Sequence, residues 1–149
     1  MFLNRLLGHL GFFLMGVHAY ALTEEVSLHV RNSTNEKWYI ANYSTKENGK
    51  YEPRGGIVVA PRDLRTWKIA FHNLPEKWPN NTQKTLIGHL ELSKSLEKKH
   101  QVYNTADIFI ISGAGKQSAW TCETFNQSLG CRITTQKDKK TLDLVIGRH

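Results

Sequence analysis

The sequence predicts an all-β fold, a single-domain antiparallel β-sandwich or barrel of about eight or nine strands. Apolar residues alternate with polar ones in many short segments, which is the two-residue period of strands with one buried face. Turn-forming residues separate these segments at the spacing typical of sandwiches. The 149 residues suit one domain, and we expect it to span 22–149 because no linker interrupts that range.

The first 21 residues have the layout of a secretory signal peptide. Arg5 gives the basic start, Leu6–Val17 forms a short apolar stretch, and Ala19-Tyr20-Ala21 supplies a small-residue cleavage site. The apolar stretch is shorter than the roughly 18 residues that a membrane-spanning helix needs. We therefore expect cleavage before Leu22 and an exported protein, either secreted or periplasmic, with no transmembrane segment in the mature chain.

The first part of the domain contains three predicted strands. Val26–Arg31 alternates apolar and polar residues, and the Asn32–Asn35 cluster after it is typical of a turn. Lys37–Tyr43 is rich in aromatic and β-branched residues that suit a strand. The Asn48-Gly49 pair favours a tight hairpin turn, so a return strand is expected from Tyr51.

The middle of the domain continues the pattern. Ile57–Ala60 is a short apolar run, typical of a strand that is buried on both faces or lies deep in a sandwich. Thr66–Phe71 alternates again. Pro75, Pro79 and the Asn80-Asn81 pair predict a long loop over His72–Lys84. Leu86–Leu92 is interpreted as a strand rather than a helix because Gly88 disfavours the helix, and one helical turn is expected in Ser93–His100.

The last third predicts two further pairs of strands. Asp107–Ser112 and Ser118–Thr124 flank a glycine turn, while Arg132–Thr135 and Thr141–Ile146 flank a charged turn over 137–140. The inward positions of all these strands predict a core. Its expected members are Val30, Ile40, Val58, Trp67, Ile69, Ile110 and Leu144.

The two cysteines, Cys122 and Cys131, are expected to form a disulfide. Paired thiols oxidise in the compartments that exported proteins reach. Eight residues with turn-forming character lie between them, so we place the cysteines on the two arms of a hairpin-like excursion. The expected Cα–Cα distance is about 4.4–6.8 Å, as disulfide geometry requires. Two thiolates alone make a poor zinc site.

Composition and motifs exclude several classes of function. No metal is expected because the histidines after Leu22 lack ligand spacing, and no cofactor is expected. The Gly113–Lys116 turn lacks the upstream glycine and the following hydroxyl of a phosphate-binding loop. The formal charge is +7 for the whole chain, and Arg5 is the only charged residue before Leu22. The mature domain therefore stays basic and favours anionic partners; nucleic acid is not expected, because no recognition helix is predicted.

Exposed aromatic and basic residues are the best candidates for binding. Trp78 lies in the proline-containing loop, where an indole has few core partners. Trp38 and Tyr39 are adjacent in a strand, so one of the two rings should be exposed. The basic cluster comprises Arg62, Arg65 and Lys68. We take Trp78, Trp38 and this cluster as the candidate binding residues.

Four asparagines begin the N-glycosylation pattern. They are Asn32, Asn42, Asn80 and Asn126. The pattern is short and arises by chance, so it assigns no modification by itself.

These observations favour a non-catalytic binding protein that recognises an anionic, carbohydrate-bearing or protein surface through its basic and aromatic loop residues. One alternative is a small exported hydrolase that uses His72 or His89 with a nearby carboxylate as an acid/base pair. Asp63, Asp107 and Glu91 are the carboxylates considered. No nucleophile signature supports it, so an enzyme is the weaker reading. A membrane-active secreted protein is a further alternative.

Overall fold

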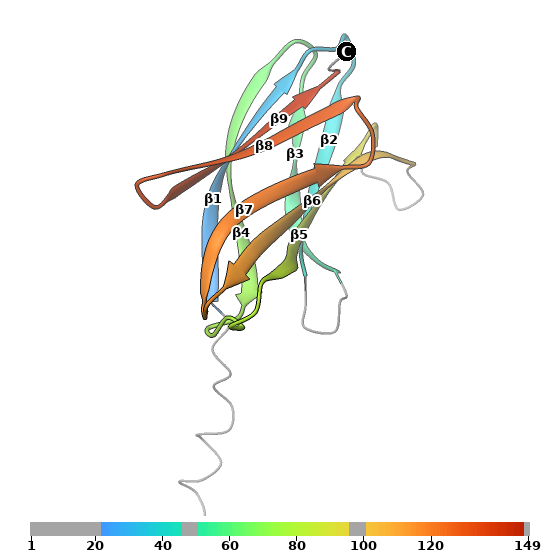
Figure 1. Ribbon diagram of the computed structural model, residues 1–149. Helices are drawn as coiled ribbons and strands as arrows, with labels where there is room; N and C mark the ends of the chain where they lie inside the picture. The colour runs from blue at the N-terminus through green and yellow to red at the C-terminus, as the bar shows by residue number, and fades with distance from the viewer. Residues whose placement is uncertain (1–21, 46–50, 96–100, 148–149) are drawn as a thin grey trace, which may run out of the picture.

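The protein is a sandwich of two packed β-sheets, as the sequence predicts (Figure 1). The computed structural model describes residues 22–45, 51–95 and 101–147. Every regular element in these ranges is a strand. The strands are β1 (Leu22–Asn32), β2 (Trp38–Thr45), β3 (Tyr51–Val59), β4 (Leu64–Leu74), β5 (Gln83–Ser93), β6 (Val102–Gly113), β7 (Lys116–Thr124), β8 (Leu129–Gln136) and β9 (Lys139–Ile146).

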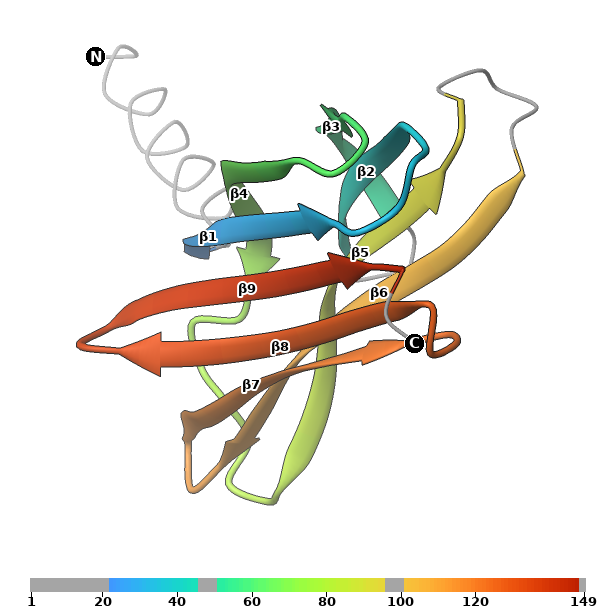
Figure 2. The ribbon, with the colours of Figure 1, turned by 90° about the horizontal axis from the view of Figure 1, so that it is seen from above.

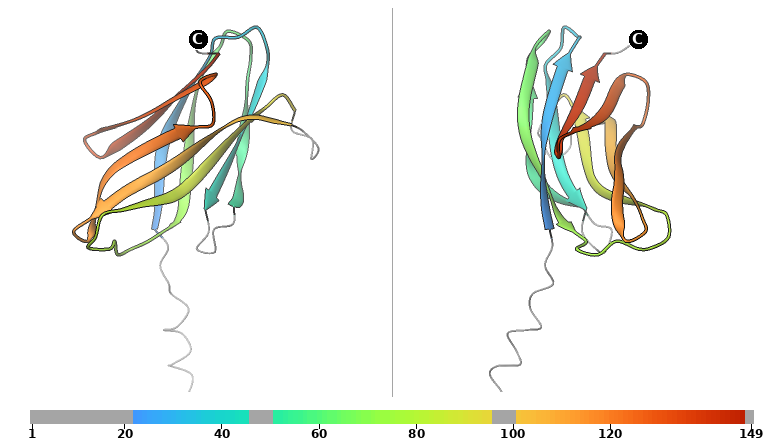
Figure 3. Two further views of the ribbon diagram at one scale, coloured as in Figure 1. Left: turned by 45° about the vertical axis from the view of Figure 1, so that its right-hand side comes forward. Right: turned by 60° about the vertical axis from the view of Figure 1, so that its left-hand side comes forward.

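One sheet has the strand order β4-β1-β9-β8 and the other β3-β2-β5-β6-β7. Neighbouring strands are antiparallel except β1 and β9, which run parallel. The view from above shows β3 and β4 at one edge of the sandwich and β7 and β8 at the opposite edge (Figure 2). The turned views show the two layers and the curvature of their strands (Figure 3). At each of these edges the chain passes from one sheet to the other.

The core lies between the sheets and contains most of the residues expected there. Val30, Ile40, Ile69, Ile110 and Leu144 are all at most 5% exposed. Two expectations are wrong: Val58 is 39% exposed and Trp67 is 43% exposed. Both residues belong to strands at the edge of their sheets, where one side lacks a neighbouring strand.

The strand β3 differs from the prediction of a strand buried on both faces. Ile57 and Val59 point inward and are buried, whereas Val58 between them faces outward. Every strand of a two-layer sandwich buries only the face toward the other sheet, so β3 alternates as the central strands β2 and β6 do. The predicted loop over His72–Lys84 is also shorter than expected, because β4 continues to Leu74 and β5 begins at Gln83.

Gly88 allows close packing between the sheets. A Cβ atom at this position would lie 2.1 Å from Cε1 of Phe71. Phe71 is fully buried at 0% exposure and lies on β4 in the opposite sheet. The interpretation of Leu86–Leu92 as a strand is confirmed. The absence of a side chain at Gly88 leaves the space that the Phe71 ring fills.

The Cys122–Cys131 disulfide forms as predicted, with a Cα–Cα distance of 6.1 Å. The hairpin interpretation of this segment is wrong. Cys122 lies on β7 and Cys131 on β8, and these strands belong to different sheets. The bond therefore joins the two layers of the sandwich at the β7–β8 edge.

Three expectations fall on residues outside the described ranges. They concern the signal peptide over 1–21, the Asn48-Gly49 turn and most of the Ser93–His100 segment. Within the described ranges, no helix has the length and apolar character required to cross a membrane.

Candidate functional site at the open edge

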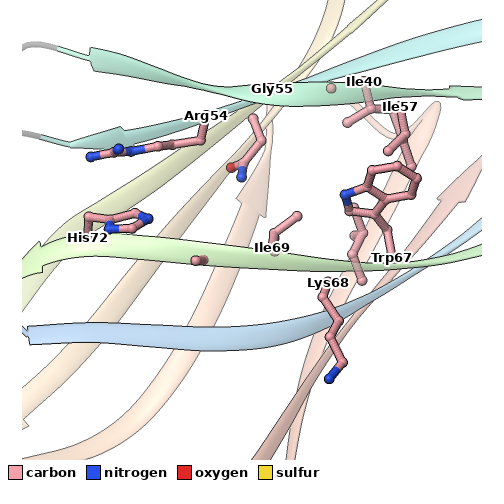
Figure 4. A pocket seen from close by; sticks show the side chains of 12 residues that line it. Ile40, Arg54, Gly55, Ile57, Trp67, Lys68, Ile69 and His72 are labelled. Atoms are coloured by element: carbon pink, nitrogen blue, oxygen red, sulfur yellow. The ribbon is translucent and has the colours of Figure 1, made fainter.

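A cleft of about 200 Å³ opens between β3 and β4, the edge strands of the two sheets (Figure 4). We call this side of the sandwich the open edge. The volume is smaller than the roughly 300–1,000 Å³ of pockets that enclose a drug-sized molecule. The cleft therefore has room for one ring or terminal group of a larger ligand. Twelve residues line it, and those from β1 and β2 are Leu28, Ile40 and Asn42.

A β-bulge in β3 shapes one wall of the cleft. Asn42 pairs with Gly55 and Tyr43 with Pro53, so Arg54 is an extra residue that no residue of β2 opposes. Gly55 has a φ of 107°, which residues with a side chain rarely adopt. Bulges bend a strand and redirect its side chains. This one brings Arg54 to the cleft.

The two ends of the cleft differ in chemistry. Arg54 from β3 and His72 from β4 lie at one end, and the indole of Trp67 lies beside Ile57 at the other (Figure 4). The His72 ring is 3.2 Å from the hydroxyl of Thr23 through Nδ1. Its backbone N–H donates to Oγ of Ser44 at 3.2 Å, which ties β4 to β2 in the opposite sheet.

Asn42 places a polar group in the otherwise apolar floor. Its side chain is on the inward face of β2 and is 6% exposed. The Oδ1 atom is fully buried and accepts no hydrogen bond from any residue that the structure describes. An unsatisfied buried acceptor costs about 1–3 kcal/mol, so its presence in a native fold requires an explanation.

The predicted basic cluster lies along the same edge of the molecule. Lys68 belongs to the strand that lines the cleft, but its side chain points away from it (Figure 4) and Nζ is 3.2 Å from a carboxylate oxygen of Glu25. Arg65 is exposed on β4, two residues from Trp67. Arg62 lies in the turn between β3 and β4, and its Nε donates to Oδ1 of Asn35 at 2.9 Å.

The structure places Trp38 and Trp78 away from the cleft. Trp38 is a core residue, 7% exposed, because the inward face of β2 carries it. Nζ of Lys94 lies 5.4 Å from the centre of its ring, and the hydrogen bond from Lys94 to Glu36 raises the pKa of that lysine. Trp78 is partly buried and packs against the core. Of the Trp38–Tyr39 pair, the Tyr39 ring is the one that faces outward, and Trp78 is half-buried.

A second cluster of titratable groups surrounds His89 on the outer face of the five-stranded sheet. Nδ1 of His89 is 2.5 Å from Asp107 and Nε2 is 3.4 Å from Glu91. The hydroxyl of Tyr43 donates to Glu91 at 3.2 Å, and burial together with that carboxylate raises the pKa of Tyr43. Each ring nitrogen of His89 therefore faces a carboxylate. This geometry leaves neither nitrogen placed to act as a base on a substrate.

The described residues contain no group of three or more His, Cys, Asp or Glu side chains that could hold a metal ion. Comparison with protein-family models, curated proteins and solved structures finds no match to this chain.

The sequence analysis named two residues that line the cleft, Lys68 as a binding residue and His72 as a possible acid/base residue, and it missed the roles of three others. Trp67 was placed in the core, Arg54 was not considered, and Asn42 was noted only as a glycosylation pattern. One available signal was the polar Asn42 at an inward position, in register with Trp38 and Ile40. A polar residue on the buried face of a strand needs a partner, and here the described residues provide none for Oδ1.

Proposed function

We propose that this chain is a non-catalytic binding protein of the secreted or periplasmic space, and that the open edge holds its ligand. The ligand class is an anionic or carbohydrate-bearing surface. The cleft supports this because it combines an exposed indole with a cationic end. Binding sites typically combine an apolar lining with a few placed polar groups.

Protection of sheet edges is the plainer explanation for part of this surface. Proline, bulges and charged residues on edge strands prevent sheets from adding further strands, and Pro53, Arg54 and Lys68 fit that role. It does not explain why an exposed indole and a guanidinium line the same cleft. The placement of Trp67 and Arg54 at the two ends of this cleft is therefore the single observation that carries the proposal (Figure 4).

The test is retention of the purified protein on immobilised polyuronate, heparin and dextran and on phosphatidylglycerol vesicles, at low and at high salt. We expect retention on the anionic polysaccharides that weakens as salt rises, because exposed charges are screened. The variant Arg54→Gln/Arg65→Gln should bind at least about tenfold more weakly, which corresponds to about 1.4 kcal/mol.

A matched control removes the same charge elsewhere. Lys137→Gln/Lys139→Gln changes two exposed lysines at the β8–β9 turn, which joins strands away from the open edge. We expect its binding to stay within about twofold of the original protein, because long-range charge has a modest effect at physiological ionic strength. Equal losses in both variants, or no retention on any anionic polymer, would refute the proposal.

A small exported hydrolase has one observation in its favour, the 2.5 Å contact between His89 and Asp107. The other ring nitrogen of His89, Nε2, faces Glu91, and this contact argues against a hydrolase. The variants His89→Gln and His72→Gln separate the classes when ester, glycoside and phosphate-ester substrates are assayed. Loss of a turnover that the original protein shows would establish the hydrolase; binding without turnover supports the binding protein.

A further inference from the structure

We propose that the free edge of β4, the side that faces away from β1, binds an acidic segment of another polypeptide as an added strand (Figure 2). The segment would bond to the backbone between Leu64 and His72, with a carboxylate beside Arg65 and an apolar side chain beside Trp67. This inference rests on the proposed binding function and names the partner more closely. It follows from the direction of the backbone groups of β4, from its exposed side chains and from its charge.

Alternate residues of β4 direct their backbone N–H and C=O groups away from β1. The backbone oxygen of Asp63 accepts from the N–H of Asn32 in β1 at 2.9 Å. The odd-numbered residues that follow Asp63 in β4 therefore face β1. Near the other end of the strand, the N–H of His72 donates to Oγ of Ser44 in the opposite sheet at 3.2 Å. The even-numbered residues consequently face the open edge.

The backbone groups of Thr66, Lys68 and Ala70 have no partner among the residues that the structure describes, because β4 pairs with β1 alone. The register of this pairing is unbroken between Leu64 and Phe71. A row of unpaired N–H and C=O groups along an edge strand is what an incoming strand uses in β-augmentation. A polypeptide carries donors and acceptors at the matching spacing, which polysaccharides and lipids lack.

The facing edge strand β3 is blocked to an added strand, whereas β4 is protected by charge alone. Pro53 and the bulge at Arg54 interrupt the edge of β3. Leu64–Ala70 contains no proline, glycine or bulge. Leu64 is 59% exposed and Trp67 is 43% exposed, and their side chains lie on opposite faces of the strand. An added strand would cover apolar surface on both faces.

The charge of β4 decides between a second copy of this chain and an acidic partner. Arg65 lies two residues from Trp67, so their side chains share one face of the strand. Lys68 lies on the other face, with Nζ 3.2 Å from a carboxylate oxygen of Glu25. Two copies of β4 side by side would bring like charges together, which is unfavourable. A carboxylate would instead pair with Arg65, which forms no ion pair with any described residue.

The experiment uses fluorescently labelled peptides of about eight residues, within the usual length of a strand. Their sequence repeats valine, threonine, glutamate and threonine. This order puts apolar and acidic side chains on one face, at the two-residue spacing of Trp67 and Arg65. We expect the glutamate peptide to bind at least tenfold more tightly, by fluorescence anisotropy, than the same peptide with lysine in place of glutamate. Equal affinities would overturn the inference.

N-methylated peptides separate strand addition from simple attraction of charge. An added strand bonds through one of its two edges, so methyl groups on alternate backbone nitrogens should abolish binding in one phase and preserve it in the other. Amide hydrogen exchange reports on the protein: Thr66, Lys68 and Ala70 should exchange rapidly in the free chain and become protected in the complex. Equal binding of the two methylated peptides would overturn the inference.

The matched variants are Thr66→Pro and Thr135→Pro. Thr66→Pro removes a backbone donor that faces the open edge and none that pairs with β1, so it should bind the glutamate peptide at least tenfold more weakly with its thermal midpoint nearly unchanged. Thr135 is equivalent on β8, because the backbone oxygen of Ser128 accepts from the N–H of Gly147 at 2.8 Å and the even-numbered residues of β8 therefore face β9. Thr135→Pro should bind within about twofold of the original protein. Equal losses in both variants would contradict the placement on β4.

The variant Arg65→Glu gives a result that unfolding cannot mimic. It should gain at least about fivefold in affinity for the lysine peptide and lose affinity for the glutamate peptide, because the charge beside the added strand is reversed. Unchanged affinities would overturn the inference. Retention on heparin, polyuronate or vesicles without binding of any strand peptide would also overturn it and leave the binding function standing. Failure to bind every peptide, polymer and vesicle would remove both.

Discussion

The two edges of the sandwich share the same strand arrangement but differ in what lies between their strands. At each edge two consecutive strands cross from the five-stranded sheet to the four-stranded one, β3 to β4 at one side and β7 to β8 at the other. The β7–β8 edge is closed by the Cys122–Cys131 bond. The β3–β4 edge instead has a cleft of about 200 Å³.

The tryptophans of the two edges show the consequence. Trp120 on β7 is 9% exposed, donates to Gln117 through Nε1 at 3.0 Å and has Nζ of Lys140 at 4.9 Å from its ring centre. Trp67 on β4 is 43% exposed. The same residue type thus stabilises the fold at one edge and remains accessible at the other. The closed edge buries its tryptophan, and the open edge leaves its tryptophan accessible beside the cleft.

The largest expected effect is a difference in stability between Trp120→Ala and Trp67→Ala. Removal of a buried tryptophan costs about 3–5 kcal/mol because transfer and cavity terms add. Trp67 buries less apolar area, so its loss should cost about 1 kcal/mol. Urea unfolding of both variants measures the two free energies. Similar costs would show that the open edge is as tightly packed as the closed one.

The next effect concerns the disulfide. Cys122→Ser/Cys131→Ser should lower the free energy of unfolding by about 2–3 kcal/mol, as chain entropy predicts for the short loop that the bond closes. The remaining core keeps the sandwich folded at room temperature. Ligand binding should persist, because the open edge lies on the far side of the molecule (Figure 2). Thermal melts and the retention assay check both parts.

The same prediction has an independent chemical check. The unaltered protein, purified without reducing agent, should show no reactive thiol after denaturation, because the structure pairs both cysteines. Two titratable thiols per chain would contradict the closed edge. A reducing agent should reproduce the stability of the double serine variant and add nothing to it.

The sequence predicted the strands well because alternation is a local property. Inward and outward faces of β1, β2 and β6 follow directly from a period of two. The position of a strand within its sheet depends on non-local pairing, which the period does not contain. Val58 and Trp67 were therefore assigned to the core, because each lies in a segment with the apolar character of a buried strand.

Signals for the open edge were nevertheless present in β3 and β4. Pro53, the Gly55-Gly56 pair and the basic residues of β4 are typical of edge strands. Their combination indicates where a sheet ends. The cleft itself was not predictable, since it requires two edge strands from different sheets to face each other, and only the tertiary structure brings them together.

Two inward asparagines extend the comparison from the edges to single groups. Asn32 is 1% exposed and fully used: its Nδ2 donates to the backbone oxygens of Glu36 and Ala60 at 2.7 and 2.8 Å, and its Oδ1 accepts from Thr34. Asn42 at the open edge is nearly as buried, but its Oδ1 has no partner in the described chain. One amide is fully used in holding the fold together, and the other leaves its buried acceptor unsatisfied.

The smallest expected effect is therefore also opposite in sign to the others. Asn32→Leu should lower the free energy of unfolding by about 2–3 kcal/mol, because several backbone and side-chain groups lose their partners. Asn42→Leu should raise it by about 1 kcal/mol, since the substitution removes an unsatisfied acceptor and adds apolar contact. Such gains are typical at sites where function has been favoured over stability. Chemical denaturation without ligand measures both changes. A loss of stability in Asn42→Leu comparable to that in Asn32→Leu would mean that Asn42 stabilises the fold as Asn32 does. The open edge would then contribute to stability as the closed edge does.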